Sequence, residues 1–194
     1  MAMDLPIDDW PLPYVEQLTV RSVEEIDLVV IHCTELPDLA MARTYGERIL
    51  YVESGSGNSG HYYIDRNGRI SRFVINERVA HHTRGFNPRS IGIELVNIGR
   101  YPDWLDSRHQ IMPEPYTPAQ LDALENLLHR LQRELPSLKR IAGHEDLDTA
   151  TEPASDNPQQ QVRRKRDPGE HFPWPRFESI GLQRIPARAE RREN

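Results

Sequence analysis

The feature that most constrains the fold is a short run, Asp27–His32, in which aliphatic and β-branched residues are consecutive and end in a polar side chain. Such a run is typical of a strand that is buried on both faces. A second run, Ser90–Val96, has the same character but carries Glu94 among its apolar residues. Because a carboxylate is rarely buried without a reason, we expect chemistry where these strands end.

Two further strand-like segments predict a hairpin. His61–Ile64 and Ile70–Val74 are separated by a linker that contains Asn67-Gly68, a pair that tolerates positive φ and favours a tight turn. A last strand edge is expected at Ile141–His144. A hairpin within an alternation of strands and helices predicts an α/β fold, a single domain with a central mixed β-sheet flanked by helices.

The helices are predicted from capping and spacing. Thr117 has the position of a helix cap, with Pro118 at the first helical position and Gln120 placed to complete a capping box. Leucines then recur at helical spacing until Pro136, which predicts an apolar stripe that packs on the sheet. Residues 38–52 also have helix-compatible spacing.

The length of 194 residues fits one domain with one hydrophobic core. We expect residues 1–20, rich in proline and acidic residues, to form an irregular lead-in, and residues 21–180 to form the catalytic domain. Within that domain, residues 148–162 have the polar, proline-containing composition of a mobile insertion loop. Residues 181–194 are expected to form a charged tail.

Composition limits the partners. The formal net charge of −6 argues against nonspecific binding of nucleic acid. The single cysteine, Cys33, excludes an intramolecular disulfide, and no apolar stretch reaches the roughly 20 residues of a membrane helix. The first residues lack the basic and apolar regions of a secretory signal. We therefore expect a cytoplasmic protein that binds neither nucleic acid nor membranes, and no obligate protein partner is evident.

Three residues are candidates for a metal site. His32 and His144 occupy the ends of predicted strands, and Asp167 lies in a turn that Pro168 and Gly169 would fix. A catalytic zinc site commonly has three protein ligands and one open position. Each residue also has a simpler explanation, because a strand-end histidine is often only hydrogen-bonded and Asp167 could merely cap its turn.

Six segments resemble type 2 N-acetylmuramoyl-L-alanine amidases, in the order in which that family has them: VVIHCTE, SGHYYIDRNGRI, AHHTRG, SIGIELVN, AGHEDL and KRDPGEHFPW. The similarity spans Val29 to Trp174, which is most of the chain. It is strongest to the AmpD-like branch, and peptidoglycan recognition proteins and T7-type lysozyme are more distant relatives. The resemblance implies the amidase and recognition-protein type of α/β fold.

The resemblance also implies roles for single residues. It implies three ligands for one zinc ion per chain: His32, His144 and Asp167. Glu94 corresponds to the catalytic acid or base, and Lys165 to a cation that stabilises the oxyanion. His82 would border the site and contact substrate. His61 is expected to support the site rather than bind metal, and Cys33 should point to the face opposite His32 because side chains alternate along a strand.

The chain departs from its more distant relatives at three positions. T7-type lysozyme and the amidase-active recognition proteins have a tyrosine where this chain has Gly60, and they lack the glutamate that corresponds to Glu94. T7-type lysozyme also uses cysteine at the position of Asp167. The differences at Glu94 and Asp167 both favour the AmpD-like mechanism. The span between His144 and Asp167 is longer than in compact AmpD-like enzymes.

The implied function is zinc-dependent hydrolysis of the amide bond between N-acetylmuramic acid and L-alanine in muropeptides, during cell-wall recycling. Two alternatives remain open. One is a muropeptide-binding module that keeps the fold without cleaving. The other is a lytic amidase that attacks intact peptidoglycan.

Overall fold

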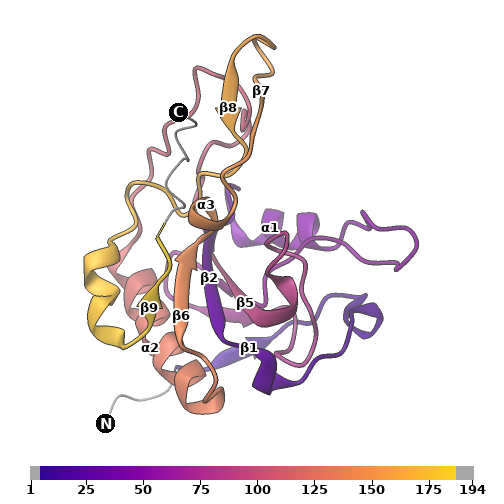
Figure 1. Ribbon diagram of the computed structural model, residues 1–194, viewed down its shortest axis with the longest axis vertical. Helices are drawn as coiled ribbons and strands as arrows, with labels where there is room; N and C mark the ends of the chain where they lie inside the picture. The colour runs from indigo at the N-terminus through magenta and orange to yellow at the C-terminus, as the bar shows by residue number, and fades with distance from the viewer. Residues whose placement is uncertain (1–4, 187–194) are drawn as a thin grey trace, which may run out of the picture.

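A seven-stranded mixed sheet forms the centre of the computed structural model, which describes residues 5–186 (Figure 1). The strand order is β1-β4-β3-β5-β2-β6-β9, and neighbouring strands are parallel except for the antiparallel pair β3–β4. The strands are β1 (Ile7–Asp9), β2 (Leu28–Cys33), β3 (Tyr62–Ile64), β4 (Ile70–Arg72), β5 (Ser90–Leu95), β6 (Arg140–Gly143) and β9 (Gln183–Arg184). The predicted α/β class with a mixed sheet is confirmed.

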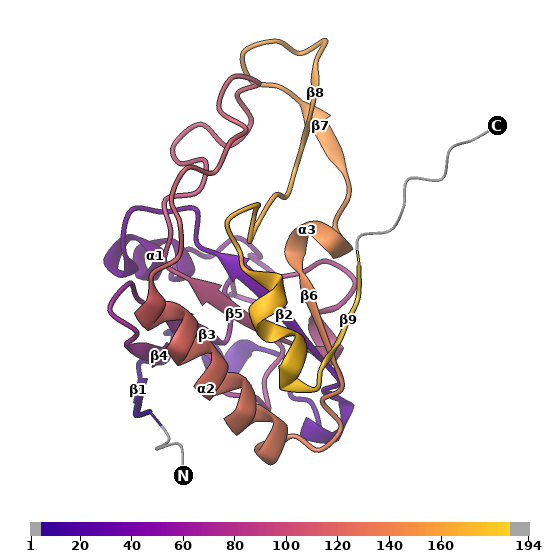
Figure 2. The same cartoon turned by 90° about the vertical axis from the view of Figure 1, so that its left-hand side faces the viewer.

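The long helix α2 (Pro118–Glu134) covers one face of the sheet together with the 3-10 helix η4 (Trp174–Ile180) (Figure 2). Its predicted capping box is present, since the Gln120 amide donates to Thr117 Oγ1 and the Thr117 amide donates to Gln120 Oε1, both at 3.1 Å. The other helices are α1 (Leu39–Gly46), α3 (His144–Leu147) and the 3-10 turns η1 (Val15–Gln17), η2 (Val23–Glu25) and η3 (Asn87–Arg89). The predicted helix over 38–52 is therefore shorter and ends at Gly46.

Side-chain alternation along β2 decides which face carries the site. Val29, Ile31 and Cys33 belong to the core cluster that includes the leucines of α2. Leu28 and Val30 are buried in a separate cluster, so they point to the other face. Since His32 has the same parity as these two residues, it also points away from α2, and Cys33 has the opposite orientation, as predicted.

The segment predicted as an irregular lead-in belongs to the fold. β1 pairs in parallel with β4 at the sheet edge, and Leu12, Val15 and Leu18 are buried in a core cluster with Phe73. Pro11 and Pro13 interrupt any periodicity, so the sequence pattern does not show that the nearby apolar residues are buried. A strand of three residues at the sheet edge also forms with few hydrogen bonds, so it does not require a strong strand pattern in the sequence.

The segment predicted as a mobile loop, 148–162, contains an antiparallel hairpin of β7 (Thr151–Pro153) and β8 (Gln161–Arg163). It projects from the domain beside residues 100–112 (Figures 1 and 2). We call these two segments, 100–112 and 148–163, the arm. Backbone and side-chain hydrogen bonds join them, including Ser155 N to Leu105 O at 2.9 Å and Ser107 N to Asp156 Oδ1 at 2.7 Å. A hairpin with polar residues on most positions has no apolar alternation to reveal it.

The predicted tail over 181–194 also begins inside the fold. β9 pairs in parallel with β6, and Leu182 is buried against the core. Residues 187–194 lie outside the described part of the chain. Within residues 5–186, no helix combines the length and apolar character needed to cross a membrane.

Candidate active site

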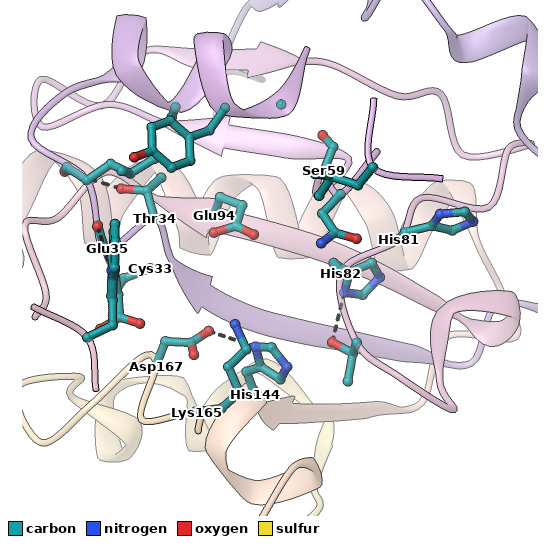
Figure 3. A pocket seen from close by; sticks show the side chains of 18 of the residues that line it. Cys33, Thr34, Glu35, Ser59, His81, His82, Glu94, His144, Lys165 and Asp167 are labelled. Atoms are coloured by element: carbon teal, nitrogen blue, oxygen red, sulfur yellow. Dashed lines mark hydrogen bonds and ion pairs between the residues drawn. The ribbon is translucent and has the colours of Figure 1, made fainter. Parts of the chain in front are cut away.

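The parallel strands β2 and β5 place the first two candidate residues side by side. His32 is in register with Glu94, so both side chains lie on the face of the sheet away from α2. Figure 3 shows Glu94 on this face, in the same pocket as His144 and Asp167. The register follows from the hydrogen bonds of two buried, uninterrupted strands. His144 is the first residue of α3, directly after β6, so the neighbouring strand brings it to the same end of the sheet.

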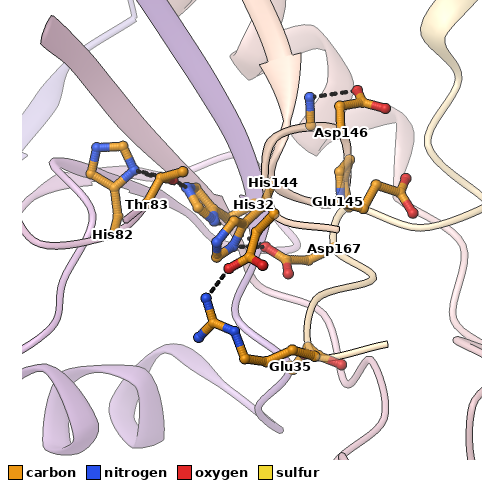
Figure 4. Close-up of polar contacts among 12 residues, drawn as sticks. His32, Glu35, His82, Thr83, His144, Glu145, Asp146 and Asp167 are labelled. Atoms are coloured by element: carbon orange, nitrogen blue, oxygen red, sulfur yellow. Dashed lines mark hydrogen bonds and ion pairs between the residues drawn. The ribbon is translucent and has the colours of Figure 1, made fainter. Parts of the chain in front are cut away.

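His32, His144 and Asp167 meet although 135 positions separate the first from the last. Asp167 Oδ2 lies 2.9 Å from His32 Nδ1 and 3.0 Å from His144 Nδ1. The two imidazole rings are 4.5 Å apart between centroids and nearly perpendicular (Figure 4). All three residues are buried, and one candidate ligand atom from each lies within 4.8 Å of the others. The structure therefore brings together the three predicted ligands.

The electrostatics of this trio suit a bound cation. Burial, together with His144, lowers the pKa of His32 to about 4, so its imidazole is neutral and able to act as a ligand at pH 7. Burial opposes ionisation of Asp167, but His144 and His32 hold the pKa of this carboxyl well below its ordinary value. Asp167 Oδ1 is buried and has no hydrogen-bond partner in the described structure. Two imidazoles and one carboxylate with an unsatisfied oxygen form a donor set that fits zinc.

Glu94 and Lys165 line the same cleft as His144 and Asp167. The cleft has a volume of about 590 Å³, within the range of small-molecule sites. Burial raises the pKa of Glu94 well above its ordinary value, Asp167 raises it further, and Lys165 opposes the shift. Gly60 leaves room for this carboxylate, since a Cβ at position 60 would approach Glu94 Cγ to 2.8 Å. A larger side chain at position 60 would therefore displace Glu94.

His82 lines the cleft and also contacts His32. Its Nδ1 lies 3.0 Å from His32 Nε2, and its Nε2 lies 3.2 Å from Ser90 Oγ. The neighbouring Thr83 also contacts His32, with its Oγ1 3.3 Å from His32 Nε2. Both ring nitrogens of His82 therefore have protein partners, and the residue can orient His32. Its predicted contact with substrate stays a prediction.

The remaining histidines lie outside the trio. His61 is buried, where its Nδ1 accepts the Gly92 amide at 3.0 Å and its Nε2 is 2.8 Å from Arg21 Nη2. His61 thus lies outside the group of candidate ligands, as expected, and its ring is held by hydrogen bonds within the fold. His129 is exposed on α2 and His171 is exposed after Glu170.

Sequence reasoning missed two residues that line the cleft, Glu35 and Arg100. They form a buried ion pair in which Arg100 Nε is 2.7 Å from Glu35 Oε1. Arg100 lies in a loop without periodicity or motif, so only the folded structure reveals the pair. Thr83 was likewise unassigned, although it stands next to His82.

The strand ends of the mixed sheet and the segment after β8 bring together two histidines, two carboxylates and a lysine, which are the groups that a metal-assisted hydrolase needs. The family model described as N-acetylmuramoyl-L-alanine amidase (Amidase_2) matches residues 22–170, which is most of the chain. This chain belongs to the N-acetylmuramoyl-L-alanine amidase family.

Several known proteins are similar to it. The 1,6-anhydro-N-acetylmuramyl-L-alanine amidase AmpD of Haemophilus influenzae is 30% identical over 129 residues, which cover 61% of this chain and 56% of that protein. The chain thus matches a little over half the length of this curated relative.

Solved structures share the fold. The endolysin LysCS, an N-acetylmuramoyl-L-alanine amidase from Clostridium intestinale, superposes with a TM-score of 0.62 at 19% identity, over 94% of this chain and all of that one. The amidase AmiD from E. coli, solved with anhydro-N-acetylmuramic acid-L-Ala-D-gamma-Glu-L-Lys, superposes with a TM-score of 0.59 at 27% identity, over 82% of this chain and 58% of that one.

Proposed function

We propose that this protein is a zinc-dependent amidase that hydrolyses the bond between N-acetylmuramic acid and L-alanine in muropeptides. The observation that carries the proposal is the convergence of His32, His144 and Asp167 beside the cleft that Glu94 and Lys165 line. Membership of the amidase family supplies the reaction to which this arrangement is suited.

In the proposal, His32, His144 and Asp167 hold one zinc ion per chain. When bound, zinc supplies a Lewis acid that polarises the scissile carbonyl and lowers the pKa of water to about 7. The protein contributes a neutral imidazole at His32 and an ionised carboxylate at Asp167, the states that ligation requires. His82 and Thr83 fix the orientation of the His32 ring by contacting its Nε2.

Glu94 moves the proton. Its carboxylate accepts a proton from the attacking water and then delivers it to the amide nitrogen of L-alanine as the C–N bond breaks. The products are the muramic acid carboxylate and a stem peptide with a free amino end. A raised pKa suits this exchange, because a carboxylate that is more basic than usual accepts a proton more readily before it returns that proton as an acid.

Lys165 stabilises the charge that develops on the scissile carbonyl oxygen. Its side chain lines the same cleft as Glu94, and it is close enough to lower the pKa of that carboxyl. A fixed cation has its greatest value where negative charge develops in the transition state. His82 is proposed to form the adjoining wall of the cleft and to contact the substrate there.

We place the activity in cell-wall recycling, on soluble anhydro-muropeptides in the cytoplasm. The relative from Haemophilus influenzae, named as an amidase for 1,6-anhydro-N-acetylmuramyl-L-alanine, supports this choice. A lytic amidase acting on intact wall is the second candidate, supported by the shared fold of the endolysin. The recycling and lytic functions differ in the size of the substrate, but the same amide bond is cleaved in both.

The test is mass spectrometry of two substrates after incubation with the purified protein: an anhydro-muramyl tripeptide and isolated sacculi. The proposal predicts rapid release of an intact tripeptide from the soluble substrate and slow release from sacculi. Faster attack on sacculi would favour the lytic alternative. Binding of the soluble substrate, seen by calorimetry, without any release would make the protein a recognition module.

A further inference from the structure

Glu35 has an unusual backbone conformation close to the active site. Its φ of +48° is the one positive value at a non-glycine residue within residues 5–186. It lies two residues beyond the end of β2, three residues after His32. A side-chain-bearing residue in this conformation is disfavoured, so the surrounding contacts must hold it there.

Those contacts come from the loop that follows β5. Arg100 Nε donates to Glu35 Oε1 at 2.7 Å and Arg100 Nη2 donates to Glu35 Oε2 at 2.9 Å. The ion pair is enclosed, with side chains only 1% and 8% exposed. Trp104 Nε1 donates to the Glu35 carbonyl at 3.2 Å. Gly99 packs against Glu35 so closely that a Cβ at position 99 would come within 2.5 Å of Glu35 Cγ.

The same guanidinium reaches the segment that carries two candidate active-site residues. Arg100 Nη1 donates to the Arg163 carbonyl at 3.0 Å, and Nη2 donates to the Arg164 carbonyl at 3.3 Å. Arg164 directly precedes Lys165, and Asp167 follows two residues after that lysine. β8 ends at Arg163, and few backbone hydrogen bonds hold the segment beyond it: the Arg164 amide donates to the Ala150 carbonyl and the Asp167 carbonyl accepts from the Glu145 amide, both at 2.9 Å.

Arg100 is thus a second physical link between the two halves of the site, besides the direct contact of Asp167 with His32. Its guanidinium forms an ion pair with Glu35, just beyond the strand that carries His32. The same group donates to the backbone carbonyls of the segment from which Lys165 and Asp167 project. A planar guanidinium can serve a bidentate carboxylate and several carbonyls at once, whereas an ammonium cannot reproduce this geometry.

We propose that Glu35 and Arg100 are a positioning pair. Their contacts fix the positions of Lys165 and Asp167 relative to His32 and Glu94. Neither residue is assigned any contact with the reacting atoms. The proposal rests on the proposed function for its effect on catalysis. Its effect on metal binding and on the order of residues 163–167 is independent of the reaction.

The experiment compares Arg100→Lys with Arg108→Lys, a matched control in the same loop whose side chain is 71% exposed. Three quantities are measured: zinc affinity by competition with a chelator, kcat and KM, and hydrogen exchange of a peptide covering residues 161–170. We expect Arg100→Lys to weaken zinc binding roughly 10- to 100-fold, as loss of ligand-orienting contacts does elsewhere. It should lower kcat more than it raises KM, and exchange in the peptide should accelerate. Arg108→Lys should match the wild type in all three.

A second variant covers the case in which Arg100→Lys does not fold. Glu35→Gln keeps the shape of the side chain and removes its charge, and we expect the same pattern of changes at smaller size. If either variant folds with wild-type zinc affinity, kcat and exchange but a lower melting temperature, the pair is merely structural and the proposal is wrong. A wild type that binds zinc without cleaving muropeptides would refute the proposed function, while the affinity and exchange measurements would still decide the role of the pair.

Discussion

The two halves of the candidate site are held in different ways. His32 and Glu94 lie on adjacent, fully paired strands, where backbone hydrogen bonds fix their register. Lys165 and Asp167 lie on an irregular segment after β8, and side-chain contacts from Arg100 hold its backbone. The first half is fixed by regular secondary structure and the second by a small number of long-range polar contacts. We expect substitutions in the two halves to differ in what they disturb.

The largest effect is expected on the strand side, at Glu94. Glu94→Gln removes the proton-transfer group but keeps the volume of the side chain, so kcat should fall by roughly 10²- to 10⁴-fold. Zinc content and melting temperature should stay at wild-type values because β5 is unaffected. Steady-state kinetics on an anhydro-muramyl tripeptide measure kcat, elemental analysis measures zinc content, and thermal denaturation measures the melting temperature. Glu178→Gln, on the exposed surface of η4, is the control.

A somewhat smaller effect is expected on the turn side, at Lys165. Lys165→Met should lower kcat by roughly 10²- to 10³-fold through loss of the oxyanion partner. The matched control is Lys139→Met, since Lys139 is the chain's other lysine and is exposed. If both variants retain full activity in the same kinetic assay, Lys165 has no role in the reaction.

The third effect concerns the support of His32. His82→Ala removes the contact to His32 Nε2, so the affinity for zinc should fall by roughly 10- to 100-fold. Competition with a chromophoric chelator measures it, and exposed His129→Ala is the control. An unchanged zinc affinity combined with a raised KM would instead assign His82 to substrate contact alone.

The smallest effect on catalysis is expected in the hydrophobic core between α2 and the sheet. Leu128 is fully buried on α2, on the face opposite the cleft, so Leu128→Ala should lower the free energy of unfolding by about 2–5 kcal/mol. The kcat of the folded protein should stay within about twofold, because the strand register does not depend on one side chain of α2. Urea denaturation and kinetics at low temperature test this pair of expectations. Ile111→Ala, 73% exposed, should change neither.

Regular elements could be predicted from the sequence because their signals are local. The apolar run of β2, the Asn67-Gly68 turn and the capping box at Thr117 each lie within a few residues. Parity along β2 was sufficient to place Cys33 opposite His32. The edge strand β1 and the arm hairpin could not be predicted, since their partners are distant and their composition is polar or interrupted by proline.

The same contrast applies to the site. The trio was found because resemblance to a family joined three residues whose individual patterns were weak. Glu35 and Arg100 belong to no such pattern, and their pairing depends on a loop closing over β2. Tertiary contacts of this kind leave no periodic trace in the sequence, so the part of the site that they hold is visible only in the folded molecule.

The most direct test of the central claim, that both halves meet at one catalytic zinc, is a zinc titration. The protein is stripped with a chelator and zinc is added back in steps, while release of tripeptide from an anhydro-muramyl tripeptide is followed by mass spectrometry. We predict no release from the stripped protein and recovery that saturates at one zinc per chain, with no recovery in His32→Ala or Asp167→Ala. Full activity in the stripped protein, or one tightly bound zinc in both variants, would contradict the account.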